Sequence, residues 1–174
     1  RGAMRFVLSR QFADLPVDRL RWNALVEETD DCTIFQTHEW FDCWWTAFGH
    51  RHQLFLITIW DDELLVGIAP LMVSRRAGLR QLEFIGSGNA DYQDFILGKR
   101  EANLLPLLAR FLFEHRNAWG IMVLRNVPTN SQTFALLPDA MRSLGLGATE
   151  FERVSCPTLA ISSHPDEARR LPDS

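Results

Sequence analysis

The stretch that decides the fold is "QLFLITIW", residues 53–60, which returns after a short polar turn as "LLVGIAPLMVS", residues 64–74. Both runs are nearly continuous in apolar residues and have the length of a strand, which is typical of strands covered on both faces. The polar turn between them predicts an antiparallel hairpin. A second turn, "RRAG" at 75–78, leads into a further predicted strand at 80–86.

Two predicted helices precede this hairpin. Residues 17–29 follow Pro16 and carry Asp18 in the first turn, as a helix start favours. Residues 38–49 repeat aromatic side chains at helical intervals, and Thr37 is the expected N-cap of this second helix. The other predicted elements are, in chain order, strand 4–9, strand 92–98, helix 100–119, strand 120–128, helix 131–145 and strand 148–162. This order predicts an α/β fold in which a mixed, largely antiparallel sheet is flanked by about four helices.

Composition narrows the class of protein. Of 174 residues, 47% are hydrophobic and 23% charged, and the net charge of −4 provides no basic field for nucleic acid. No apolar run approaches the roughly 20 residues of a membrane span. Cys32, Cys43 and Cys156 are too scattered for a disulfide framework, and His50 and His52 lack a third metal ligand nearby. We therefore expect a cytoplasmic protein with no metal, no nucleic-acid partner and no membrane span.

Three glycine-containing strings resemble phosphate-binding motifs, but their flanking elements do not suit that role. "GSGNAD", residues 86–91, precedes a predicted strand, whereas a dinucleotide site needs a helix N-terminus there. "RSLGLG", residues 142–147, fits the R-x-x-G-x-G string of acetyl-CoA-binding transferases but closes a helix. That position favours a helix cap at Gly145 over an acyl-CoA loop. "RRAGLR", residues 75–80, is a predicted hairpin turn.

The stretch "FIGSGNADYQDFIL", residues 84–97, places acidic and aromatic side chains between two apolar runs. In a strand that begins at Tyr92, Tyr92 and Asp94 share one face while Asp91 and Gln93 share the other. A carboxylate can hold or deprotonate an amine, and a tyrosine can protonate a leaving thiolate. The alternative is a polar turn with a half-exposed strand beyond it.

Three segments together resemble the N-terminal half of a bacterial acetyltransferase-like family in the GNAT superfamily. They are "TIFQTHEWFDCWWTAFG", "LVGIAPLMVS" and "LRQLEFIGSGNADYQDFI", and the resemblance runs from about residue 22 to 157. Members of that family are often associated with cellulose or other exopolysaccharide biosynthesis and are similar to Fem-type aminoacyltransferases. The resemblance implies a GNAT-like fold and transfer of an acetyl or related acyl group from acyl-CoA to an amine of a sugar or cell-envelope precursor.

The resemblance also implies site residues and partners. Asp91, Tyr92 and Asp94 are the expected catalytic residues, and the residues expected to contact substrate behind them are Gln36, Trp40 and Asn89. In that family two GNAT-like halves sit in tandem and the acyl-CoA loop belongs to the second. We therefore expect residues 1–3 to be a cloning remnant, 4–161 to form the N-terminal domain, and 162–174 to be a linker or the start of a second half. The acyl-CoA-binding residues would then lie in that half or in a partner subunit.

A second class of function is also consistent with the sequence. The chain would then be a non-catalytic GNAT-like module that recognises a glycan or a partner domain. An exposed Trp44 or Trp60 would support glycan stacking.

Overall fold

The computed structural model describes residues 3–30, 32–99 and 104–151. They form one mixed sheet of order β1-β2-β3-β4-β6, with β5 pairing with another part of β3. Every pairing is antiparallel except that of β4 with β6. The strands are β1 (Met4–Ser9), β2 (Gln53–Asp61), β3 (Leu64–Arg76), β4 (Leu79–Phe84), β5 (Ile96–Leu97) and β6 (Ile121–Met122). The α-helices are α1 (Arg19–Glu28), α2 (His38–Phe48), α3 (Leu104–Glu114) and α4 (Gln132–Ser143). Short 3-10 turns are η1 (Phe12–Asp14), η2 (Ile34–Gln36), η3 (Gly49–Arg51) and η4 (Arg116–Ala118).

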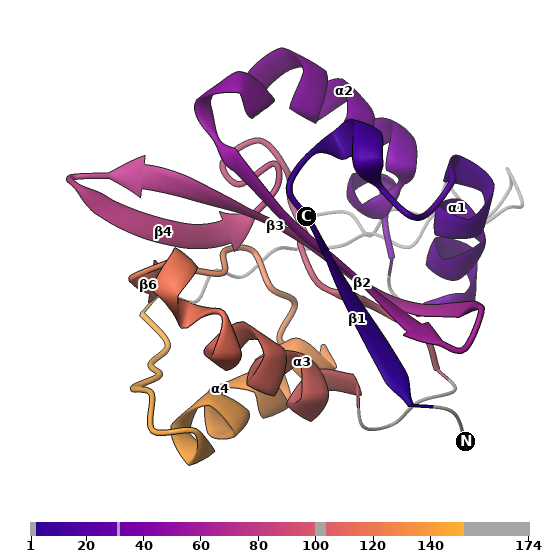
Figure 1. The fold of residues 1–174 in the computed structure, drawn as a ribbon. Helices are drawn as coiled ribbons and strands as arrows, with labels where there is room; N and C mark the ends of the chain where they lie inside the picture. The colour runs from indigo at the N-terminus through magenta and orange to yellow at the C-terminus, as the bar shows by residue number, and fades with distance from the viewer. Residues whose placement is uncertain (1–2, 31, 100–103, 152–174) are drawn as a thin grey trace, which may run out of the picture.

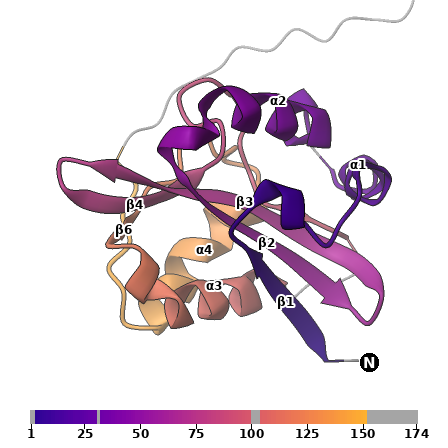
Figure 2. The same ribbon diagram turned by 45° about the horizontal axis from the view of Figure 1, so that its top comes forward.

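The helices form two layers on opposite faces of the sheet. In Figures 1 and 2, α1 and α2 lie over one face and α3 and α4 over the other. Alternate residues of β2 point to the two sides, so that Phe55 belongs to the same core cluster as Leu108 of α3, while Leu56 belongs to the cluster that includes Trp22 of α1. This arrangement explains why residues 54–60 of β2 and 65–73 of β3 are almost entirely apolar, because this part of each strand is buried on both faces. The predicted α/β fold with a largely antiparallel sheet and four flanking helices is confirmed.

The two predicted hairpin turns are also confirmed. Arg76 pairs directly with Leu79, so Ala77 and Gly78 alone form the turn between β3 and β4. Their φ angles of +47° and +81° are those of a two-residue turn that suits the twist of a hairpin. The expected helix start at Thr37 is confirmed as well, because its side chain accepts a hydrogen bond from the Trp40 amide.

The sheet has a gap beside Pro70. β4 pairs with residues 71–76 of β3, while β5 pairs with Gly67 and Ile68 of the same strand. The Pro70 carbonyl accepts from the Ile85 amide at 2.9 Å, so the Pro70 nitrogen, which carries no hydrogen, faces this same edge. A proline cannot donate to the ladder, and the ladder stops here for lack of a donor.

Several predicted elements are shorter in the structure. The strand expected at 92–98 comprises only β5, and the strand expected at 120–128 comprises only β6. Tyr92 and Asn126, which fall inside these two expected strands, have left-handed φ angles of +53° and +56° that an extended strand does not allow. Residues 148–151 form no strand, and the rest of the strand expected at 148–162 lies outside the described residues. The helix expected at 100–119 begins, within the described residues, at α3 and continues after Glu114 as η4. None of the helices in the described ranges is long and apolar enough to cross a membrane.

Candidate functional site

Residues 85–95, which we call the acidic loop, leave the sheet at the gap beside Pro70. The chain turns sharply at Gly86, whose backbone φ of +89° is rarely adopted by residues other than glycine. The Asn89 amide then donates back to the Gly86 carbonyl at 2.9 Å. The glycine pattern in this stretch therefore serves a tight turn, and the turn places the acidic residues beyond it.

Gln36 holds the acidic loop in place from η2. Its side chain is buried, and its Nε2 donates to the Tyr92 carbonyl. Its Oε1 accepts from the Thr33 amide at 2.6 Å and from the Thr33 hydroxyl at 2.8 Å. All these contacts are internal, so Gln36 is a positioning residue for the loop. A direct contact of Gln36 with a substrate stays a prediction.

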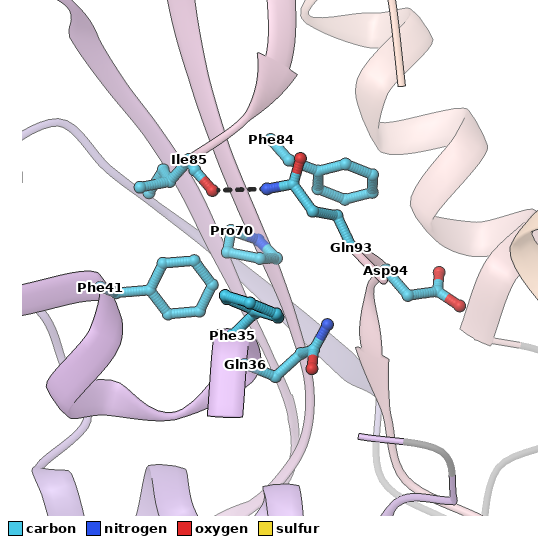
Figure 3. A pocket seen from close by; sticks show the side chains of 8 residues that line it. All are labelled: Phe35, Gln36, Phe41, Pro70, Phe84, Ile85, Gln93 and Asp94. Carbon is cyan, nitrogen blue, oxygen red and sulfur yellow. Dashed lines mark hydrogen bonds between the residues drawn. The ribbon is translucent and has the colours of Figure 1, made fainter. Parts of the chain in front are cut away.

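Gln93 and Asn126 fix the other side of the loop, and sequence reasoning did not single them out. The Gln93 amide donates to the Asn126 carbonyl at 3.0 Å, and the Gln93 side chain donates to the Ile85 carbonyl at 2.8 Å (Figure 3). The Asn126 side chain donates in turn to the Ala90 carbonyl at 2.8 Å. The sequence did contain a signal for the role of Asn126. It precedes Val-Pro within an expected strand, and asparagine tolerates the left-handed backbone found here better than most residues do.

Asp94 lies at the N-terminus of α4 and is half-buried. Its Oδ1 accepts from the Phe95 amide at 2.7 Å, and the hydroxyls of Thr133 and the helix N-cap Ser131 also hydrogen-bond to it. Burial raises the pKa of Asp94 above its usual value, and these hydrogen bonds offset only part of that effect. Asp94 is therefore a carboxyl group whose proton affinity has been increased by its surroundings.

Asp91 and Tyr92 are exposed beside it, but not in the arrangement expected of a strand. Tyr92 has a left-handed φ of +53°, so the predicted alternation of Tyr92 and Asp94 on one face with Asp91 and Gln93 on the other is wrong. Of residues 91–94, only Gln93 is buried, at 4% exposure. A left-handed backbone at a residue other than glycine costs on the order of 1–3 kcal/mol and is found mostly at functional sites and tight turns. No ion pair with a basic residue in the described ranges neutralises Asp91 or Asp94.

Trp40 and Asn89 flank the turn at Gly86. The Asn89 side-chain oxygen accepts from the Trp44 indole at 3.3 Å. The Trp40 indole nitrogen is buried without a hydrogen-bond partner, and it lies 3.2 Å from where a Cβ on Gly86 would stand. Trp40 thus lies against the acidic loop, and Asn89 belongs to the loop and links it to α2.

The hollow behind the acidic loop is closely packed. Figure 3 shows the side chains that line it, which come from η2, α2, the gap in the sheet and the loop itself. They are Phe35, Gln36, Phe41, Pro70, Phe84, Ile85, Gln93 and Asp94. The enclosed volume is about 0 Å³ for a water molecule, so this hollow holds no ligand. A ligand of the acidic loop must therefore approach its outer side.

The other candidate strings have structural roles. Gly145, at φ +86°, donates to the Arg142 carbonyl at 2.9 Å while Leu146 donates to the Met141 carbonyl at 3.1 Å. These two bonds make a helix-ending motif, which is what the position of "RSLGLG" predicts. Trp44 and Trp60 are only 6% and 2% exposed, so neither offers a surface for glycan stacking. Within the described ranges, no three histidine, cysteine or acidic side chains are grouped as metal ligands would be.

Comparison with known proteins gives fold-level similarity at most. No family model matches the sequence, and no curated protein matches it. Among solved structures, the chain is similar to a ribosomal-protein-alanine N-acetyltransferase from Brucella melitensis biovar Abortus 2308, at 14% identity and a TM-score of 0.46, over 91% of this chain and 100% of that one. It is also similar to a possible acetyltransferase from Clostridium difficile 630, at 10% identity and a TM-score of 0.48, over 90% of this chain and 99% of that one. At these values the similarities carry no argument about chemistry.

Proposed function

We propose that this chain forms one wall of an N-acyltransferase site, which moves an acetyl or related acyl group from acyl-CoA to an amine of a sugar or cell-envelope precursor. The sequence resemblance to the N-terminal half of GNAT-type transferases motivates the proposal. The observation that carries it is Asp94, a half-buried carboxyl with a raised pKa beside two exposed loop residues.

The acidic loop suits an amine for electrostatic reasons. Asp91 and Asp94 form no ion pair with the described arginines or lysine, so an ammonium group would be the first cation to reach them. Transfer requires the amine to lose protons, and a base works best when its pKa approaches the working pH. The raised pKa of Asp94 is a shift in that direction.

Each predicted residue has a distinct task in this proposal. Asp91 attracts the ammonium, which gives one proton to water and becomes a neutral amine. The amine nitrogen then bonds to the acyl carbon and loses a second proton to Asp94, while the bond from the acyl carbon to sulfur breaks and the thiolate departs. Tyr92, 38% exposed, orients the acceptor or gives its phenolic proton to the departing thiolate. Trp40, Asn89 and Gln36 keep the loop in the conformation that presents these groups.

A second surface completes the site. The hollow behind the loop is filled, and both arginine–glycine strings that resemble acyl-CoA motifs are a hairpin turn and a helix end. The described residues therefore do not fit a CoA cradle, and we assign that role to a second GNAT-like half or a partner subunit.

The filled hollow also favours the alternative of a non-catalytic module that docks a partner on the outer side of the acidic loop. The two functions differ in whether Asp94 takes part in chemistry. Only the transferase requires activity that depends on ionisation of Asp94.

The test uses a longer protein that contains this chain together with its second half, and the chain alone. Acetyl-CoA binding is measured by calorimetry, and acyl transfer to amino sugars is measured by release of the CoA thiol. We expect binding only in the longer protein, and a loss of about 10²–10⁴ in kcat for Asp94→Asn. The control Asp42→Asn, at an exposed position on α2, should keep full activity. Activity that survives both Asp94→Asn and Tyr92→Phe would refute the proposed roles and leave the docking module.

A further inference from the structure

His52 connects η3 to β2, and its imidazole ring packs against α2. The centroid of this ring lies 5.6 Å from that of Trp44, which is 6% exposed. The Nδ1 atom of His52 is buried and has no hydrogen-bond partner among the described residues. Since η3 follows α2 directly, the His52 ring joins the C-terminal half of α2 to the start of β2.

The charged groups that act on His52 come from three elements. Among the described residues, Glu83 of β4 is the one carboxylate, and the basic groups are Arg76 of β3 with His50 and Arg51 of η3. Glu83 is fully buried, and its Oε1 atom lies 3.9 Å from the Arg76 Nε without accepting a hydrogen bond. No ion pair in the described ranges joins Glu83 to His52, so the carboxylate acts on the imidazole only from a distance.

A proton on His52 is therefore poorly accommodated in this conformation. Burial lowers the pKa of His52 below its usual value, and the attraction of Glu83 offsets only part of that effect. In a conformation that exposes the ring, the pKa of a histidine is about 6.5. The exposed conformation thus binds more protons as pH falls through about 6.5, and the stability of the buried conformation decreases over this range.

A cavity beside His52 gives the ring a place to turn. Its volume is about 490 Å³, and it is lined by His52 itself, by His50 and Arg51, and by the end of the β3–β4 hairpin. Gln53 and Val73 are the last pair between β2 and β3, so His52 lies just beyond the paired part of these strands. Its ring can leave Trp44 and enter the cavity without separating β2 from β3.

We infer that His52 is a pH-sensitive anchor, which holds η3 and the C-terminal half of α2 on the sheet at neutral pH and releases them in mild acid by turning into this cavity. The positive charge that the proton adds beside Arg76 and Arg51 favours the same movement. The Trp44 indole donates to the Asn89 side chain at 3.3 Å, so the release reaches the acidic loop through Trp44. This inference does not depend on the function proposed for the acidic loop.

The test is an NMR titration of the histidines of the full chain from pH 8 to 5, with amide protection factors measured by hydrogen exchange at pH 7.5 and 5.5. The His52 amide donates to the Gly49 carbonyl at 2.9 Å and the Gly49 amide donates to the Trp45 carbonyl, so both amides report on η3. Their protection factors should fall about 5- to 10-fold at pH 5.5, as uptake of one proton with a pKa of about 6.5 in the exposed conformation allows. The Ile57 amide, in the middle of β2, should keep its protection factor.

Three variants separate the anchor from a general effect of acid. His52→Gln should abolish the pH dependence at the Gly49 amide, whereas His50→Gln, at an exposed position on η3, should retain it. Glu83→Gln should lower the pKa of His52 further, because it removes the one attractive charge. A pKa of His52 above 6.5, protection that is constant or rises in acid, or a pH dependence that persists in His52→Gln would each overturn the inference. Circular dichroism of each variant checks folding, and the wild-type titration tests the inference without any variant.

Discussion

The Tyr92–Gln93 peptide bond is held from both sides, which makes Gln36 a sensitive position. The carbonyl of this peptide accepts from the Gln36 side chain, and its amide donates to the Asn126 carbonyl. Changing Gln36 to Leu preserves approximate size while it removes three hydrogen bonds, one to Tyr92 and two to Thr33. At about 1 kcal/mol for each bond, and with buried groups left unpaired, we expect a loss of about 2–4 kcal/mol in the free energy of unfolding.

Urea denaturation monitored by tryptophan fluorescence measures this loss. The midpoint temperature of thermal unfolding should fall by about 2–4 °C for each kcal/mol lost. The matched control is Gln11→Leu, because Gln11 is exposed and caps η1 without a side-chain bond. It should change stability by less than about 0.5 kcal/mol. Hydrogen exchange at the Gln93 amide adds a local measure, and it should accelerate in Gln36→Leu. A loss below about 1 kcal/mol, or an unchanged exchange rate at Gln93, would refute the reasoning.

Three further predictions concern the same loop. Because the pKa of Asp94 is raised in the fold, the wild type is favoured relative to Asp94→Asn at acid pH. This stability advantage should disappear as pH rises from about 4, the pKa of an aspartate in the unfolded chain, through the higher pKa of Asp94 in the fold. Unfolding midpoints of both proteins from pH 3 to 8 test this prediction, and a stability difference that does not change with pH would contradict it. Gly86→Ala should cost about 1–3 kcal/mol by chemical denaturation, more than Gly88→Ala, since only the former places a Cβ against Trp40; equal losses would exclude that contact. Ser131→Ala should cost about 1 kcal/mol in thermal unfolding through loss of the α4 cap and should raise the pKa of Asp94 in an NMR titration, and an unmoved pKa would show that the hydroxyl does not stabilise the carboxylate.

Much of the fold is predictable from the sequence because its signals are local. The apolar runs of β2 and β3 show burial on both faces, and the two-residue turns fix the register between neighbouring strands. Thr37 marks a helix start by a bond to an amide only three residues away. None of these inferences requires knowledge of a distant contact.

The site was less predictable because its geometry depends on distant contacts. The polar residues of the acidic loop stand out in the sequence, but the conformation of the loop depends on Gln36 and Asn126, each more than 30 residues away from the group it holds. Those bonds stabilise a left-handed backbone at Tyr92 where alternation predicted an extended strand.

The gap at Pro70 has a consequence for how any ligand meets the acidic loop. An imino acid has no hydrogen to offer in any conformation, so the covalent structure itself keeps the neighbouring strands from closing here. The place where the acidic loop leaves the sheet is thus fixed by the sequence itself. A ligand that approaches the outer side of the loop therefore meets a backbone that is already in place, and less of its free energy of association is spent on ordering the loop.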